Sequence, residues 1–174
     1  MNVMQSNRGA IASAALAVVL QIVLAPAIAV SAAVPNIVAV AVLCYALARP
    51  QMAGYVMPFL VGLVFDLVSG GPIGPMAFTL TLMSFVVARV FLAVDNDTLF
   101  IPLVLLCTGL VLVELIFGLF MLALGYNAGF FDALVHRIVP CALYDCLIGL
   151  VAYPLVTRLF GRPSLPQPGV AQLR

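Results

Sequence analysis

Three carboxylate side chains stand out in this sequence because each lies within or at the end of a long apolar stretch: Asp66, Glu114 and Asp145. Burying an ionisable group in an apolar phase is costly, so such residues usually pair with a partner, bind a ligand or take part in chemistry. Arg137 and the single histidine, His136, are the nearby counter-charges that we consider. These five residues are the first candidates for a polar site.

The spacing of these residues favours neither a metal centre nor a catalytic one. The chain has one histidine, and its acids follow no spacing typical of metal ligands. No H-E-x-x-H sequence is present and no serine is close to the histidine, which leaves Asp66 with Asp145 as a conceivable protease dyad. Four cysteines lie in apolar runs without C-x-x-C spacing and are interpreted as packing residues: Cys44, Cys107, Cys141 and Cys146. We predict a non-enzymatic protein without a cofactor.

The amino-acid composition indicates that this chain lies in a lipid bilayer. Of its 174 residues, 66% are hydrophobic and 7% are charged, whereas soluble domains contain roughly 45–50% apolar and about 25% charged residues. The mean hydropathy of +1.28 requires apolar surface on all sides of the helices. A net charge of +1 supplies no basic surface for nucleic acid. The sequence therefore predicts an integral membrane protein that does not bind nucleic acid.

Breaks in hydropathy divide the chain into six predicted transmembrane helices, near 10–30, 35–48, 53–68, 76–93, 99–124 and 138–158. We expect an all-α polytopic domain over 1–160 and a short disordered cytoplasmic tail over 161–174. The second segment is short: its 14 residues reach about 21 Å, less than a hydrocarbon core of about 30 Å. It must be recessed among its neighbours or extended by its flanks, unless it forms a re-entrant hairpin.

The arginines predict the orientation, because basic residues collect on the cytoplasmic side of membrane proteins. With six crossings and a cytoplasmic N-terminus, Arg137 is the one arginine outside, and the six on the cytoplasmic side are Arg8, Arg49, Arg89, Arg158, Arg162 and Arg174. Five crossings would remove this asymmetry. We therefore expect both termini in the cytoplasm and the connection from Asp66 to Pro75 on the outer face.

This orientation places the three acids in the outer half of the bundle. Glu114 lies about 22 Å from the inner end of its helix, and Asp145 lies about 12 Å below the outer surface. We expect these two carboxylates to converge with Asp66, near Arg137 and His136. The cluster either lines a polar cavity open to the outside or forms structural hydrogen bonds and ion pairs between helices.

The densest local pattern is the turn that follows Asp66. Asp66 and Ser69 can accept hydrogen bonds from free backbone amides, Gly70 and Gly71 permit positive φ, and Pro75 suits the first turn of a helix. An ordinary helix-to-helix turn would have the same features.

A hydrophobic helix that ends in Gly-x-x-x-Asp, followed by a Ser/Gly/Pro turn and a new apolar helix, resembles the rod shape-determining MreD family. The matching positions are Gly62, Asp66, Ser69, Gly70, Pro72, Ile73 and Gly74. Size, inward termini and short loops are also similar over about 10–160, and the specific motif falls within 54–90.

The resemblance implies a non-enzymatic inner-membrane component of the bacterial elongation machinery, which builds lateral-wall peptidoglycan. Its implied partner is MreC, with MreB, RodA and a class B penicillin-binding protein in the wider complex. The family is also similar in fold to the S components of energy-coupling-factor vitamin transporters. Uptake of a small molecule through an outward cavity is therefore the alternative, with Ala10, Ala14 and Ala17 as a small-residue docking face that would equally suit helix packing.

Overall fold

A computed structural model describes residues 3–29, 33–94, 100–126 and 129–160, with side chains from residue 11 onward. The predicted disordered tail over 161–174 lies outside the described residues, as do Arg162 and Arg174 and the side chains of Arg8 and Ala10.

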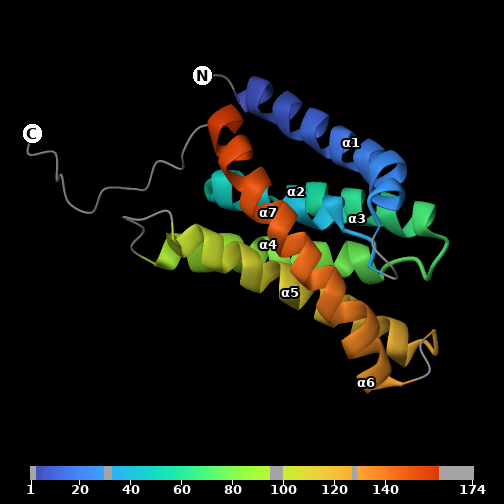
Figure 1. Ribbon diagram of the computed structural model, residues 1–174. Helices are drawn as coiled ribbons and strands as arrows, with labels where there is room; N and C mark the ends of the chain where they lie inside the picture. Colours follow the sequence, from blue (N-terminus) through green and yellow to red (C-terminus); the bar gives the residue numbers. More distant parts are fainter. Residues whose placement is uncertain (1–2, 30–32, 95–99, 127–128, 161–174) are drawn as a thin grey trace, which may run out of the picture.

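The described chain is built from helices, which confirms the predicted all-α class (Figure 1). The elements are α1 (Val3–Ala27), α2 (Ile37–Ala48), the 3-10 turn η1 (Pro50–Met52), α3 (Val56–Ser69), α4 (Pro75–Ala93), α5 (Phe100–Ala123), α6 (Phe130–Ala133), the π-helical turn η2 (Leu134–Ile138) and α7 (Val139–Phe160). By length and composition, α4, α5 and the continuous helix over 130–160 could each cross a membrane, and α2, α3 and the part of α1 from Ile11 are shorter apolar helices.

Successive long helices alternate in direction, so the start of α1 and the end of α7 lie at the same end of the bundle (Figure 1). A hydrogen bond fixes part of this end, because the Arg49 guanidinium after α2 donates to the carbonyl oxygen of Phe160 (Nε to O, 2.9 Å). This arrangement is the one expected of a chain with six crossings and both termini on one side. The number of crossings and their direction in the membrane remain predictions.

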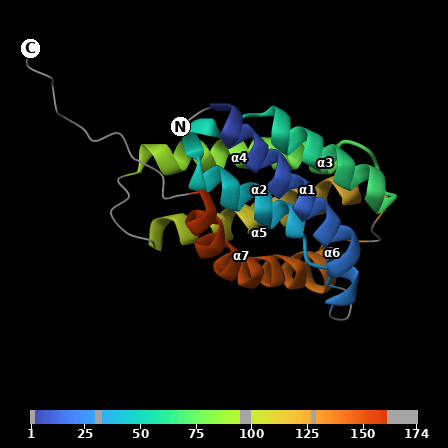
Figure 2. The same cartoon turned by 90° about the horizontal axis from the view of Figure 1, so that it is seen from above.

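Helix α2 is the centre of the bundle and packs against α1, α3, α4, α5 and α7 (Figure 2). None of its residues is exposed, and Leu43 and Leu47 are fully buried in the hydrophobic core. At 1.5 Å per residue its 12 residues measure about 18 Å. The short second segment is therefore enclosed by its neighbours, which is one of the alternatives that the sequence left open.

The predicted connection from Gly125 to Arg137 is shorter than expected. Helical structure begins at Phe130 and continues without a break through η2 into α7. Asp132, His136 and Arg137 lower the local hydropathy, but all three side chains are exposed. The helix continues because these polar residues lie outside the packed interior, where they do not oppose helix formation.

Candidate functional site

The Asp66 carboxylate holds the start of the next helix. Near the end of α3, its Oδ2 accepts hydrogen bonds from the amides of Gly74 (2.8 Å) and Ala77 (3.2 Å), and its Oδ1 accepts from Met76 (3.2 Å). The first amides of a helix have no partner within the helix, and a carboxylate there also faces the positive end of the helix dipole. Asp66 is 3% exposed. It therefore caps α4 from a neighbouring helix.

Gly62 lets α3 approach α4 closely enough for this cap. A Cβ atom at Gly62 would lie 2.5 Å from Cα and 2.8 Å from N of Ala77, so no side chain fits there. The two residues are four apart on α3 and therefore share one face of that helix. The Gly-x-x-x-Asp pattern thus has a physical basis. The glycine lets the two helices approach closely, and the aspartate, one turn later on the same face, accepts hydrogen bonds from the first amides of α4.

The turn between the two helices depends on glycines at both ends. Gly70 ends α3 with φ of 66°, and Gly74 precedes α4 with φ of 116°. Pro75 takes the first helical position, as predicted. Ser69 differs from the prediction: its hydroxyl donates to the carbonyl oxygen of Phe65 (2.7 Å) one turn earlier, rather than accepting from the turn. Gly71 also differs, because it is not among the glycines with positive φ.

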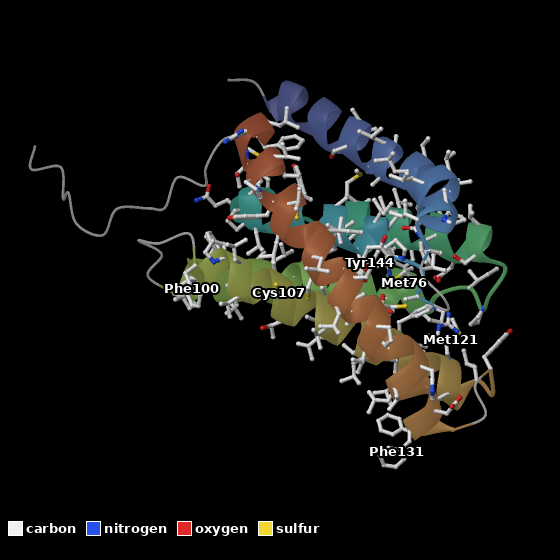
Figure 3. All side chains as sticks on the ribbon, in the orientation of Figure 1. Met76, Phe100, Cys107, Met121, Phe131 and Tyr144 are labelled. Atoms are coloured by element: carbon white, nitrogen blue, oxygen red, sulfur yellow. The ribbon has the colours of Figure 1, made fainter. Side chains whose placement is uncertain are left out.

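The turn rests on α5 and presents an apolar tip. The space beside Gly71 is occupied by the Met121 side chain, whose Cε would lie 3.6 Å from an added Cβ (Figure 3). Pro72 is half-buried, whereas Ile73 is 65% exposed. The motif therefore combines a buried polar anchor with an exposed hydrophobic residue.

The other two acids meet at Asn36, directly before α2. The Asn36 amide donates to Oδ1 of Asp145 (2.7 Å), and its side-chain Nδ2 donates to Oε1 of Glu114 (3.2 Å). The Asn36 Oδ1 accepts from the amide of Ala39 (3.0 Å) and so caps α2. All three residues are buried, and Asp145 is fully so. The second acid site therefore joins α2, α5 and α7 at one asparagine.

The two acid sites share one residue, Met76, which contributes its side chain to one site and its backbone amide to the other. Asn36 Nδ2 also approaches Sδ of Met76 (3.9 Å), and the Met76 amide is one of the three that bind Asp66. Figure 3 places Met76 toward the end of the bundle where α3 turns into α4. The predicted convergence of Asp66, Glu114 and Asp145 is therefore present, as two adjacent hydrogen-bonded sites rather than one cluster of carboxylates.

The connection between α1 and α2 is fixed to the same region by side chains from both sides. Gln21 Nε2 donates to the carbonyl oxygen of Pro35 (3.1 Å), and its Oε1 accepts from the amide of Val38 (3.3 Å). The Tyr144 hydroxyl, one residue before Asp145, donates to the carbonyl oxygen of Ile28 (2.8 Å). These bonds hold the entry to α2 against α1 and α7.

The predicted counter-charges contribute less than expected. Among the described residues, Arg137 forms no ion pair with the acids, although its exposed guanidinium lies within electrostatic range of Glu114. His136 pairs with Asp132 at 3.0 Å on the surface instead. The described part of the chain also contains no group of three or more histidine, cysteine or acidic side chains that could hold a metal ion. Hydrogen bonds, rather than ion pairs, hold the buried acids, and among the described residues the Oδ2 atom of Asp145 is buried without a hydrogen-bond partner.

Sequence reasoning missed Asn36, which falls at the start of the second predicted segment, 35–48, and was given no role there. The detectable signal was its position: an asparagine directly before an apolar helix is a preferred N-cap. Its bonds to Glu114 and Asp145 span 78 and 109 residues, and no local pattern predicts them.

One comparison with known proteins identifies a family. The family model described as rod shape-determining protein MreD matches residues 9–162, nearly the whole chain. No curated protein and no solved structure matches the chain. The matched region contains the close α3–α4 contact, the capped turn and the three buried acids. The chain belongs to the rod shape-determining protein MreD family.

Proposed function

We propose that the protein is a non-enzymatic scaffold of the bacterial elongation complex in the inner membrane, and that it binds MreC directly. Membership of the family supports a role in determining rod shape. MreB, RodA and a class B penicillin-binding protein belong to the wider assembly in this proposal. The bilayer and these proteins, rather than a substrate, are what the chain recognises.

The observation that carries the proposal is the set of three hydrogen bonds from the amides of Gly74, Met76 and Ala77 to Asp66. These bonds use the buried carboxylate to fix a turn, which leaves it little freedom to act as a base or nucleophile. The same turn exposes Ile73 at 65% and, at the end of α3, Leu67 at 60% and Val68 at 54%. A rigid turn with an apolar tip suits docking of a partner, because little conformational entropy is lost on binding.

In the proposed orientation this tip faces outward, at the level where a bitopic partner emerges from the membrane. We expect the MreC chain to contact the tip as it leaves the bilayer. Asp66 then acts as a positioning residue, and Ile73 as a contact residue.

The test replaces the buried anchor, Asp66, and the exposed tip residue, Ile73, in separate variants, in rod-shaped cells that depend on this protein. Asp66→Ala should round the cells and reduce recovery of MreC in mild detergent, because the turn loses its anchor. Ile73→Asp should reduce MreC recovery while the protein inserts and unfolds thermally like the wild type.

Two controls share the same end of the bundle. Asp132→Ala removes an exposed acid, and Leu124→Asp introduces a charge at an exposed apolar position. Both should leave cell shape and MreC recovery unchanged. Normal rods and normal MreC recovery for Asp66→Ala and Ile73→Asp would overturn the proposal.

A further inference from the structure

A groove lies between α1, α2, α3 and α4, away from the acid sites. Its volume is about 220 Å³, and its lining includes Ala14, Ala17, Tyr45, Met52, Val61 and Ser84. Ala17, Val61 and Ser84 are buried and form the floor, whereas Met52 and another lining residue, Val56, are exposed at the rim. The groove therefore opens to the surroundings of the bundle, which for an apolar helix surface are lipid.

The groove exists because α2 is short. The outer ends of α2 and α4 lie together, since Asn36 contacts Met76. From that level α4, with 19 residues, extends about 10 Å further than α2, with 12. The chain leaves α2 through η1 before it reaches the end of α4, so Met52, Ala53 and Gly54 close the groove at a recessed level.

Two aromatic rings connect a cation, Arg89, to the segment that closes this groove. Tyr55 follows the lining residue Gly54, and its ring packs on Phe85 with centroids 5.3 Å apart. The Arg89 guanidinium lies 5.1 Å from the Phe85 ring centroid and is exposed. Among the described residues Arg89 forms no ion pair. Ser84 and Arg89 are five residues apart on α4, so their backbones are about 7.5 Å apart along the helix, and the Arg89 side chain reaches back toward the groove as far as the Phe85 ring.

We propose that this groove binds one acyl chain of an anionic phospholipid from the inner leaflet, with the phosphate group at Arg89. The lining is largely apolar and the cation lies beyond the rim, next to the Tyr55–Phe85 ring pair, which matches the order of chain and headgroup in a lipid. Basic pockets between helices on the cytoplasmic side are known to recognise such headgroups. The volume of about 220 Å³ is below the roughly 300–1,000 Å³ of ligand pockets, so the open groove would hold part of an acyl chain that continues into the bilayer.

The test is native mass spectrometry of the full-length protein alone, exchanged into phosphatidylglycerol, cardiolipin or phosphatidylethanolamine with matched acyl chains. The wild type should retain the two anionic lipids more than phosphatidylethanolamine. Arg89→Gln should lower this preference about fivefold, the factor that one arginine near an anionic surface contributes. Ala14→Phe should reduce retention of all three lipids because it fills the groove.

Each variant has a matched control. Ala15→Phe places the same ring on the exposed neighbour of Ala14, and Arg158→Gln removes another exposed arginine at the same end of the bundle. Both should retain lipid like the wild type. Unchanged lipid preference in Arg89→Gln would overturn the proposal, as would unchanged retention of all three lipids in a folded Ala14→Phe. The measurement uses no partner protein, so its result is independent of the proposed binding of MreC.

Discussion

The backbone amide of Asn36 donates a 2.7 Å hydrogen bond to Oδ1 of Asp145, and this bond joins positions 109 residues apart. It fixes the beginning of α2 to the middle of the last helix. Because α2 packs against all the other long helices, this bond helps to set the position of the whole central helix.

Asp145→Leu should destabilise the protein more than Asp145→Asn. Leucine leaves the buried Asn36 amide without an acceptor, which costs about 1–3 kcal/mol, whereas asparagine keeps an oxygen in the same place. Thermal unfolding in detergent measures the difference. Asp132→Leu, at an exposed acid, should have little effect, and equal unfolding of Asp145→Leu and the wild type would show that the bond contributes nothing.

Asn36→Ala should also lower stability, by about 1 kcal/mol for the lost helix cap and further for the lost bond to Glu114. Asn36→Asp keeps the cap oxygen but faces the Glu114 carboxyl with a second acid. We therefore expect Asn36→Asp to be no more stable than Asn36→Ala in the same thermal unfolding measurement. Recovery of wild-type stability by Asn36→Asp would mean that capping alone matters at this position.

Much of this fold could be predicted from the sequence, because apolar runs and turn residues are local properties. The ends of α3 and α4 differ from the prediction by few residues, and the Asp66 turn was recognised from its residue types. The pairing of Asn36 with Glu114 and Asp145 could not be predicted, since hydropathy averages a segment and says nothing about which side chains meet. The early start of the last helix at Phe130 was missed for the same reason. The sequence shows that the residues after Phe130 include polar ones, but it does not show that their side chains are exposed.

Gly62→Ala should be strongly destabilising, because its Cβ would lie 2.5 Å from the Ala77 backbone, and backbone cannot move aside like the end of a side chain. Overpacking of this kind costs about 1–3 kcal/mol and should displace α4 from the Asp66 carboxylate. Gly129→Ala is the matched control, since nothing lies within 4 Å of the added Cβ and the backbone there is extended. Equal thermal stability of the two variants would contradict the close contact.

Substitution by asparagine should have different effects at the two turn glycines, Gly70 and Gly74. Gly70 lies in the left-handed helical region with φ of 66°, which asparagine tolerates, whereas φ of 116° at Gly74 lies outside it. Neither position has an atom within 4 Å of an added Cβ, so backbone strain alone separates them. Gly70→Asn should keep cell shape and thermal stability, and Gly74→Asn should impair both. The opposite order would mean that the turn adopts another conformation in the membrane.

The orientation predicted from the arginines can be tested with single cysteines in a chain whose native cysteines are replaced by alanine. Ile73→Cys lies at the end of the bundle with the Asp66 turn, and Gln51→Cys lies at the opposite end, in η1; both positions are exposed. A membrane-impermeant maleimide should label Ile73→Cys in intact cells and Gln51→Cys only after the inner membrane is opened, because arginine collects on the cytoplasmic side. The reversed pattern would place the turn inside, where a partner's outer segment could not reach it, and the proposed contact with MreC would fail with it.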